Sequence, residues 1–163
     1  MTRVLLIFSM LLLITTACSA PAQQVGALPQ FSQYPAIEIY SAPAVAVTLN
    51  GEPNIFRTRL KNAAKQSVNF AGEYVLTTWG CGASCIYGAV VNLKTGEVVF
   101  LPASFHVGLL ESEPLRFHSN SRLLVMRGAL SEGGEHAAHY YEYTGGKFMH
   151  LKTVPIGGRS DEQ

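Results

Sequence analysis

The chain has 163 residues, of which 48% are hydrophobic and only 14% are charged, so it accommodates one domain with a hydrophobic core and is not of the disordered class. Its 12 basic residues are balanced by 11 acidic ones, which excludes the overall positive charge on which non-specific nucleic-acid binding depends. Asp161, close to the C-terminus, is the only aspartate, so Ser-His-Asp triads, paired catalytic aspartates and Asp-rich metal loops are excluded from the domain.

Residues 1–17 are typical of a bacterial signal peptide. Arg3 supplies a positive charge, and the apolar stretch that follows it is shorter than the roughly 20 residues that a membrane span needs. The sequence Ile-Thr-Thr-Ala-Cys at residues 14–18 resembles the lipobox of bacterial lipoproteins. This resemblance implies a lipid anchor on Cys18 that attaches the protein to a membrane, and Ser19 after it implies an outer-membrane lipoprotein that faces the periplasm or the cell surface.

A second processing site competes with the lipobox. Ala20-Pro21-Ala22 matches the pattern of ordinary secretory cleavage, which would release a soluble periplasmic or secreted chain that begins at Gln23. Both forms of processing leave Cys81 and Cys85 as a pair in an oxidising compartment.

Residues 18–43 are expected to form a lipid-anchored tether or linker. Four prolines interrupt this stretch, and their spacing favours extended chain over helix. Its second half contains Phe31, Tyr34 and Ile37, so a loop that packs along the domain is the alternative there.

Residues 44–155 are expected to form the globular domain, and residues 156–163 a flexible tail. Apolar residues at helical spacing predict one short helix from Phe56 to Gln66. From Glu73 onward, short apolar runs alternate with glycine-containing turns, which is typical of antiparallel strands that follow one another in the sheet. The expected strands are 73–79, 85–93, 97–101, 115–118, 122–128, 136–144 and 147–153, with a possible further strand at 44–49.

The fold class is therefore mainly β (α+β), a single-domain antiparallel β-meander with one short N-terminal helix. Two strands differ in their expected burial. In the strand 85–93 alternate residues share one apolar face, which we expect to be the buried one. The run Leu123 to Met126 is apolar on both faces and predicts a strand that is covered on both sides.

The most distinctive segment joins Phe70-Ala71-Gly72-Glu73-Tyr74 to Trp79-Gly80-Cys81-Gly82-Ala83-Ser84-Cys85. It resembles a group of exported bacterial proteins of unknown activity that share an F-A-G-x-Y run followed by W-G-C-G-x-x-C. The resemblance covers residues 69–101. It implies a small exported β-rich domain and assigns no catalytic residue.

Cys81 and Cys85 flank a short turn between two predicted strands, which favours a structural disulfide. A redox-active pair and a thiolate metal site are the alternatives. Redox-active pairs usually have two intervening residues and a helix after them, and a zinc site needs two further ligands.

Two groups of side chains predict a possible interaction surface. Arg57, Lys61 and Lys65 form a basic row on the predicted helix, suited to anionic lipid headgroups or an acidic partner. Aromatic residues at the last predicted hairpin are suited to a glycan or protein ligand if one face is exposed, and they include Tyr140, Tyr141 and Tyr143. The alternatives are a solvated helix face and ordinary core packing.

No catalytic residue, metal site or cofactor is assigned. His136 and His139 would point to opposite faces of the predicted strand, which disfavours joint metal binding, and no nucleophile elbow or phosphate-binding loop occurs. We therefore expect a non-enzymatic cell-envelope lipoprotein that binds an envelope protein or a glycan, and no nucleic acid. The alternative is an envelope enzyme, either thiol-redox through Cys81 and Cys85 or an unrecognised hydrolase that uses Ser84 or Ser104.

Overall fold

The computed structural model describes residues 26–108 and 113–156. The predicted signal peptide, Cys18 and residues 157–163 lie outside the described residues. None of the helices in the described ranges has the length and apolar content needed to span a membrane.

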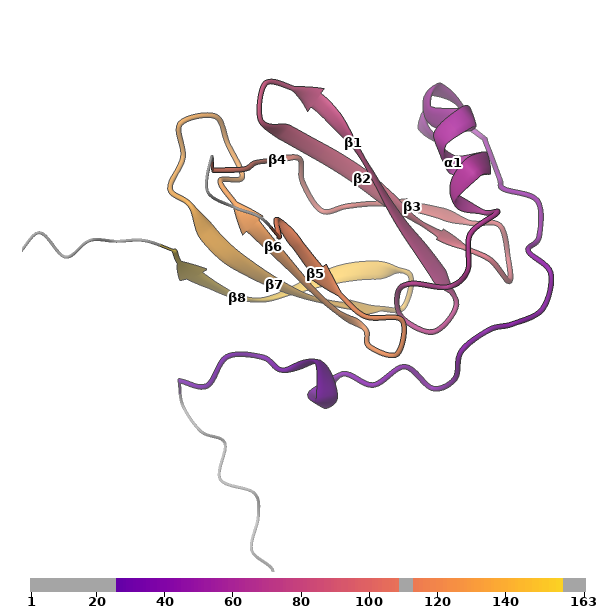
Figure 1. Cartoon of the computed structure of the whole chain (residues 1–163), viewed down its shortest axis with the longest axis horizontal. Helices are drawn as coiled ribbons and strands as arrows, with labels where there is room; N and C mark the ends of the chain where they lie inside the picture. The colour runs from indigo at the N-terminus through magenta and orange to yellow at the C-terminus, as the bar shows by residue number, and fades with distance from the viewer. Residues whose placement is uncertain (1–25, 109–112, 157–163) are drawn as a thin grey trace, which may run out of the picture.

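Two antiparallel sheets form the domain, which confirms the predicted mainly β class (Figure 1). The first sheet contains β1 (Tyr74–Gly82), β2 (Cys85–Asn92), β3 (Val98–Phe100) and β4 (Phe105–His106). The second contains β5 (Leu115–Phe117), β6 (Leu123–Gly128), β7 (Ala137–Thr144) and β8 (Lys147–Pro155). The helical elements are η1 (Phe31–Gln33), η2 (Glu52–Phe56) and α1 (Arg57–Ala63).

The seven strands predicted from residue 73 onward are all present, and three local predictions need correction. β4 was not predicted, because two residues show no measurable periodicity. Residues 44–49 are not a strand: Val45 and Thr48 each donate one backbone hydrogen bond, to Leu93 O and Gly96 O, both at 2.8 Å. The helix is shorter than expected, because α1 ends at Ala63 and residues 64–66 form a turn, while Phe56 belongs to the 3₁₀ helix η2.

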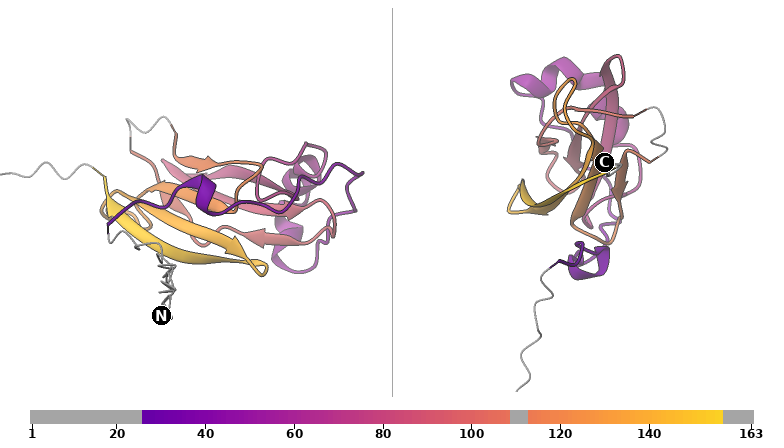
Figure 2. Two further views of the ribbon diagram at one scale, coloured as in Figure 1. Left: turned by 90° about the horizontal axis from the view of Figure 1, so that it is seen from below. Right: turned by 90° about the vertical axis from the view of Figure 1, so that its left-hand side faces the viewer.

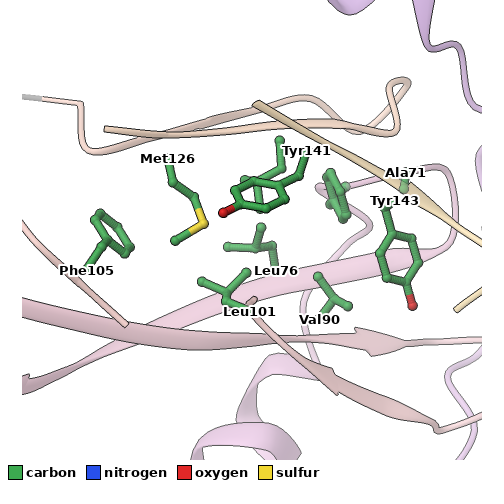
Figure 3. Packing of buried hydrophobic residues seen from close by; sticks show 10 residues of the cluster. Ala71, Leu76, Val90, Leu101, Phe105, Met126, Tyr141 and Tyr143 are labelled. Carbon is green, nitrogen blue, oxygen red and sulfur yellow. The ribbon is translucent and has the colours of Figure 1, made fainter. Parts of the chain in front are cut away.

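The main hydrophobic core lies between the two sheets (Figure 3). Leu76 and Val90 reach into it from the first sheet, and Leu124, Met126 and Tyr141 reach into it from the second. Removing these side chains from water is the principal force that holds the sheets together.

Both sheets are also covered on their outer faces. Leu60 of α1 packs on Ala89 and Val91 of β2, so the face of β2 predicted to be buried is buried. The opposite face, which includes Val90, is buried as well, and this was not predicted. The expected double cover of β6 is confirmed: Leu124 and Met126 belong to the central core, while Leu123 and Val125 pack under Phe31 and Tyr34.

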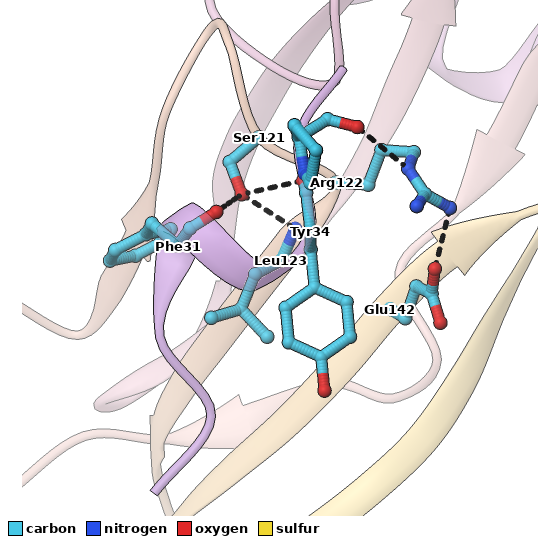
Figure 4. A network of polar contacts seen from close by, with 7 residues as sticks. Phe31, Tyr34, Ser121, Arg122, Leu123 and Glu142 are labelled. Atoms are coloured by element: carbon cyan, nitrogen blue, oxygen red, sulfur yellow. Dashed lines mark hydrogen bonds and ion pairs between the residues drawn. The ribbon is translucent and has the colours of Figure 1, made fainter. Parts of the chain in front are cut away.

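Residues 30–49, which we call the N-terminal strap, contribute to both covers: Phe31 and Tyr34 pack on the second sheet, while Tyr40, Val47 and Leu49 pack with α1 on the first. Ser121 Oγ contacts the carbonyl oxygens of Phe31 at 2.9 Å and Tyr34 at 3.1 Å, and Arg122 N donates to Tyr34 O at 2.8 Å (Figure 4). The tether predicted over residues 18–43 is therefore wrong for its second half, and the packed-loop alternative is correct there. Extended, proline-containing chain satisfies its carbonyl groups on β6 and buries its two aromatic rings.

Backbone hydrogen bonds fasten β6 to the first sheet at both ends. Before β6, the amides of Ala71 and Gly72 donate to Ser121 O at 3.1 Å and Ser119 O at 2.7 Å. After β6, His106 and Ala129 exchange two bonds, at 2.8 and 2.9 Å. The F-A-G-x-Y run thus provides the turn that joins the two sheets.

Replacing Gly72 with alanine is expected to destabilise the domain strongly, as measured by urea denaturation. Gly72 has a φ of 84°, and a Cβ there would lie 2.3 Å from Glu38 O of the strap. Gly133 is the matched control, because its φ is 71° and nothing lies within 4 Å of its Cβ position. We expect Gly133→Ala to cost about 1 kcal/mol and Gly72→Ala at least about 2 kcal/mol more. Equal losses would contradict this account of the strap.

Candidate functional site

The exposed face of α1 carries the basic row predicted from the sequence. Leu60 and Ala63 face the first sheet and are buried, which turns Arg57, Lys61 and Lys65 toward solvent. Arg59 is exposed as well. The helical spacing therefore places one apolar side on the core and a cluster of positive charge on the surface.

Within residues 26–108 and 113–156, no acidic side chain forms an ion pair with this row. Arg57 Nε donates to Asn54 O at 3.4 Å, and Lys65 Nζ donates to Asn62 Oδ1 at 3.5 Å. Within the described ranges the ion pairs join Arg116 to Glu113 and Arg122 to Glu142, both outside α1. In the described part of the chain, this row therefore presents positive charge to solvent without an ion-pair partner.

An exposed apolar side chain lies next to the basic row. Ile55, in η2, retains 78% of its accessible surface. We call Ile55, Arg57, Arg59, Lys61 and Lys65 the α1 surface. Sequence analysis missed Ile55, and its only signal was a large aliphatic residue outside the helix's apolar stripe.

The α1 surface lies at one end of the molecule. In Figure 1 the described chain enters at Gly26, at the opposite end of the longest axis from α1. Figure 2 shows the same separation from below. The strap spans the length of the domain between these two points.

The tyrosine half of the predicted interaction surface is wrong. Tyr140, Tyr141 and Tyr143 retain only 9%, 6% and 3% of their accessible surface. Tyr141 and Tyr143 belong to the core between the sheets, and Tyr140 packs under the strap with Phe31 and Tyr34. The exposed hairpin face that this surface required is absent at these three tyrosines, because Tyr140 packs under the strap and the other two lie in the core, so the core-packing alternative is correct.

Cys81 and Cys85 form the expected disulfide, with their Cα atoms 5.1 Å apart, across the turn between β1 and β2. Cys81 is exposed and Cys85 is half-buried. His106 of β4 is the cross-strand partner of Cys85, an arrangement that the sequence did not reveal because β4 was not predicted. Cross-strand partners in an antiparallel pair project to the same face, so an imidazole lies beside the bridge.

His136 and His139 have different surroundings. His139 is buried, with Nδ1 3.0 Å from Thr153 Oγ1 and Nε2 3.2 Å from Gly128 O. His136 is exposed. In the described part of the chain, no three His, Cys, Asp or Glu side chains are grouped to hold a metal ion.

Burial lowers the pKa of His139, although its hydrogen bond to the Gly128 carbonyl opposes the shift. The unfolded chain therefore binds a proton near pH 6.5 that the folded chain does not, and stability falls as the pH drops below this value. We expect the free energy of unfolding to decline between about pH 7 and pH 5, and His139→Gln to reduce this decline. His118→Gln, at an exposed position, serves as the control. An unchanged pH dependence in His139→Gln would contradict the assignment.

Comparison of the chain with known protein families, curated proteins and solved structures found no match. The resemblance carried by the F-A-G-x-Y and W-G-C-G-x-x-C runs remains a prediction. The function must therefore be inferred from the surfaces and side chains described above.

Proposed function

We propose that this protein is an exported lipoprotein, anchored through Cys18, that acts as a non-enzymatic binding module at the cell envelope. Its docking site is the α1 surface, and its partner is an acidic protein. The observation that carries the proposal is the row of exposed cations that no carboxylate of the described chain neutralises.

The charge and apolar content of the α1 surface support a protein partner. Complementary charges increase the rate of encounter and exclude partners of the wrong sign, while a central apolar side chain supplies the contact that excludes water. Ile55 beside Arg57 provides that combination.

The partner's chemistry is testable with fluorescently labelled poly-L-glutamate as an acidic polypeptide. The triple variant Arg57→Gln, Lys61→Gln, Lys65→Gln should bind it at least about tenfold more weakly than the unmodified protein, a loss of about 1.4 kcal/mol. Anisotropy titrations measure the affinity. The matched control is Lys94→Gln, Arg116→Gln, Lys147→Gln, which removes the same net charge elsewhere on the surface.

Equal weakening in both triple variants would show that only net charge matters and would contradict a localised site. A parallel titration uses vesicles that contain phosphatidylglycerol. Binding to these vesicles, with none to poly-L-glutamate, would replace the acidic protein by an anionic membrane surface.

The intact mass of the protein, from membranes and from the soluble fraction, tests the anchor. We expect a membrane-bound chain that begins at Cys18 and carries two or three acyl groups. A chain that begins at Gln23 without lipid would contradict the anchor and favour a periplasmic or secreted protein. The alternative cleavage after Ala22 produces that form.

A second candidate function is dithiol–disulfide exchange, which the exposure of Cys81 and the position of His106 favour. The intact mass after alkylation of the protein tests it. Alkylation without reductant should leave both cysteines unmodified if the bridge is structural. Alkylation of Cys81 and Cys85 in part of the protein would instead support a bridge that cycles with a cellular dithiol.

A further inference from the structure

Two hollows adjoin one another where the strap, the F-A-G-x-Y turn and the β7–β8 hairpin meet. The larger has a volume of about 560 Å³ and the smaller about 260 Å³. They share three lining residues, Tyr74, Tyr143 and Gly146. We call the two hollows together the tyrosine groove. None of its lining residues belongs to the α1 surface, although Pro53 of η2 lines the smaller hollow.

The shared wall is a pair of tyrosines in contact. The ring centroids of Tyr74 and Tyr143 lie 4.8 Å apart with an interplanar angle of 73°. Tyr143 is buried, whereas Tyr74 is half-buried. Burial raises the pKa of both phenols, so each hydroxyl stays neutral and can both donate and accept a hydrogen bond.

A carboxylate extends this wall. Glu73 lines the larger hollow, and its Oε1 accepts a hydrogen bond from the buried Asn92 Nδ2 at 2.8 Å. A carboxylate accepts about four hydrogen bonds, so Glu73 keeps acceptor capacity for a ligand. The larger hollow therefore presents acceptors and neutral hydroxyl groups next to an aromatic ring.

The charge of the groove disfavours an anionic ligand. Carboxylates contributed to its lining are those of Glu38, Glu73 and Glu97, against the cations of Lys94 and Arg122. Arg122 is paired with Glu142 and also donates to Pro35 O at 3.2 Å, so its charge is already compensated (Figure 4). The groove differs in this respect from the α1 surface.

We infer that the tyrosine groove binds an uncharged oligosaccharide, with sugar units on both sides of the Tyr74–Tyr143 wall. Sugar hydroxyls donate and accept at once, which matches a wall of carboxylate and phenol groups. The half-buried ring of Tyr74 offers an apolar face to the C–H side of a sugar. The volume of the larger hollow falls in the range of small-molecule sites.

Titration of the folded chain with neutral sugars, followed by NMR of the backbone amides, tests this inference. The probes are tetrasaccharides of glucose, of N-acetylglucosamine and of mannose, each compared with its monosaccharide. At least one tetrasaccharide should shift the amides of Glu73, Tyr74, Gly145 and Gly146. Its monosaccharide should bind at least about tenfold more weakly, because it fills only one hollow.

Two conservative variants assign the contacts. Glu73→Gln keeps an acceptor for Asn92 and Tyr74→Phe keeps the ring, so both should fold, and each should weaken binding at least about fivefold. Glu132→Gln, in an exposed turn, and Tyr87→Phe, on the outer face of the first sheet, are matched controls that should leave binding unchanged. The Gln triple variant of α1 and about 0.5 M salt should also leave it unchanged, which separates this site from the proposed function.

Three results would overturn the inference. The first is that none of the tetrasaccharides shifts these amides, and the second is that Glu73→Gln and Tyr74→Phe bind as tightly as the controls. The third is that tetra-alanine shifts the same amides while the sugars do not, which would identify the groove as a peptide site.

Discussion

The hydrogen bonds from the Ala71–Gly72 turn to the Ser119–Ser121 turn are the constraint on which the other contacts depend. They fix the start of β1 against the start of β6 and so set the two sheets face to face. The same two turns receive the strap, because Tyr40 N donates to Gly72 O and Ala36 N donates to Asn120 O. The core, the cover of the second sheet and the tyrosine groove all follow from this junction.

The two proposed binding sites differ in charge and shape. The α1 surface is basic and projects from an end of the domain, so it can engage a flat acidic partner. The tyrosine groove is enclosed by three chain segments and contains more acid than base. A single protein could therefore hold a neutral polymer in one site and an acidic protein at the other.

The sequence predicted the strands well because their periods and glycine turns are local signals, and the basic row of α1 followed from helical spacing for the same reason. The burial of Tyr140 could not be predicted, since it depends on Phe31 and Tyr34 more than a hundred residues earlier in the chain. The tyrosine groove was missed in the same way. Its wall pairs Tyr74 with Tyr143, and only the closed sandwich brings them together.

The strap has a consequence for the order in which the chain matures. Its bonds to Ser121 join residues that are 87 and 90 positions apart, and a loop of this size closes late and slowly. The segment next to the predicted export signal thus gains its native contacts only after the chain as far as β6 is present on the same side of the membrane. A chain that crosses a membrane from its N-terminus would remain unfolded, and so able to pass through a translocation channel, until most of it had crossed.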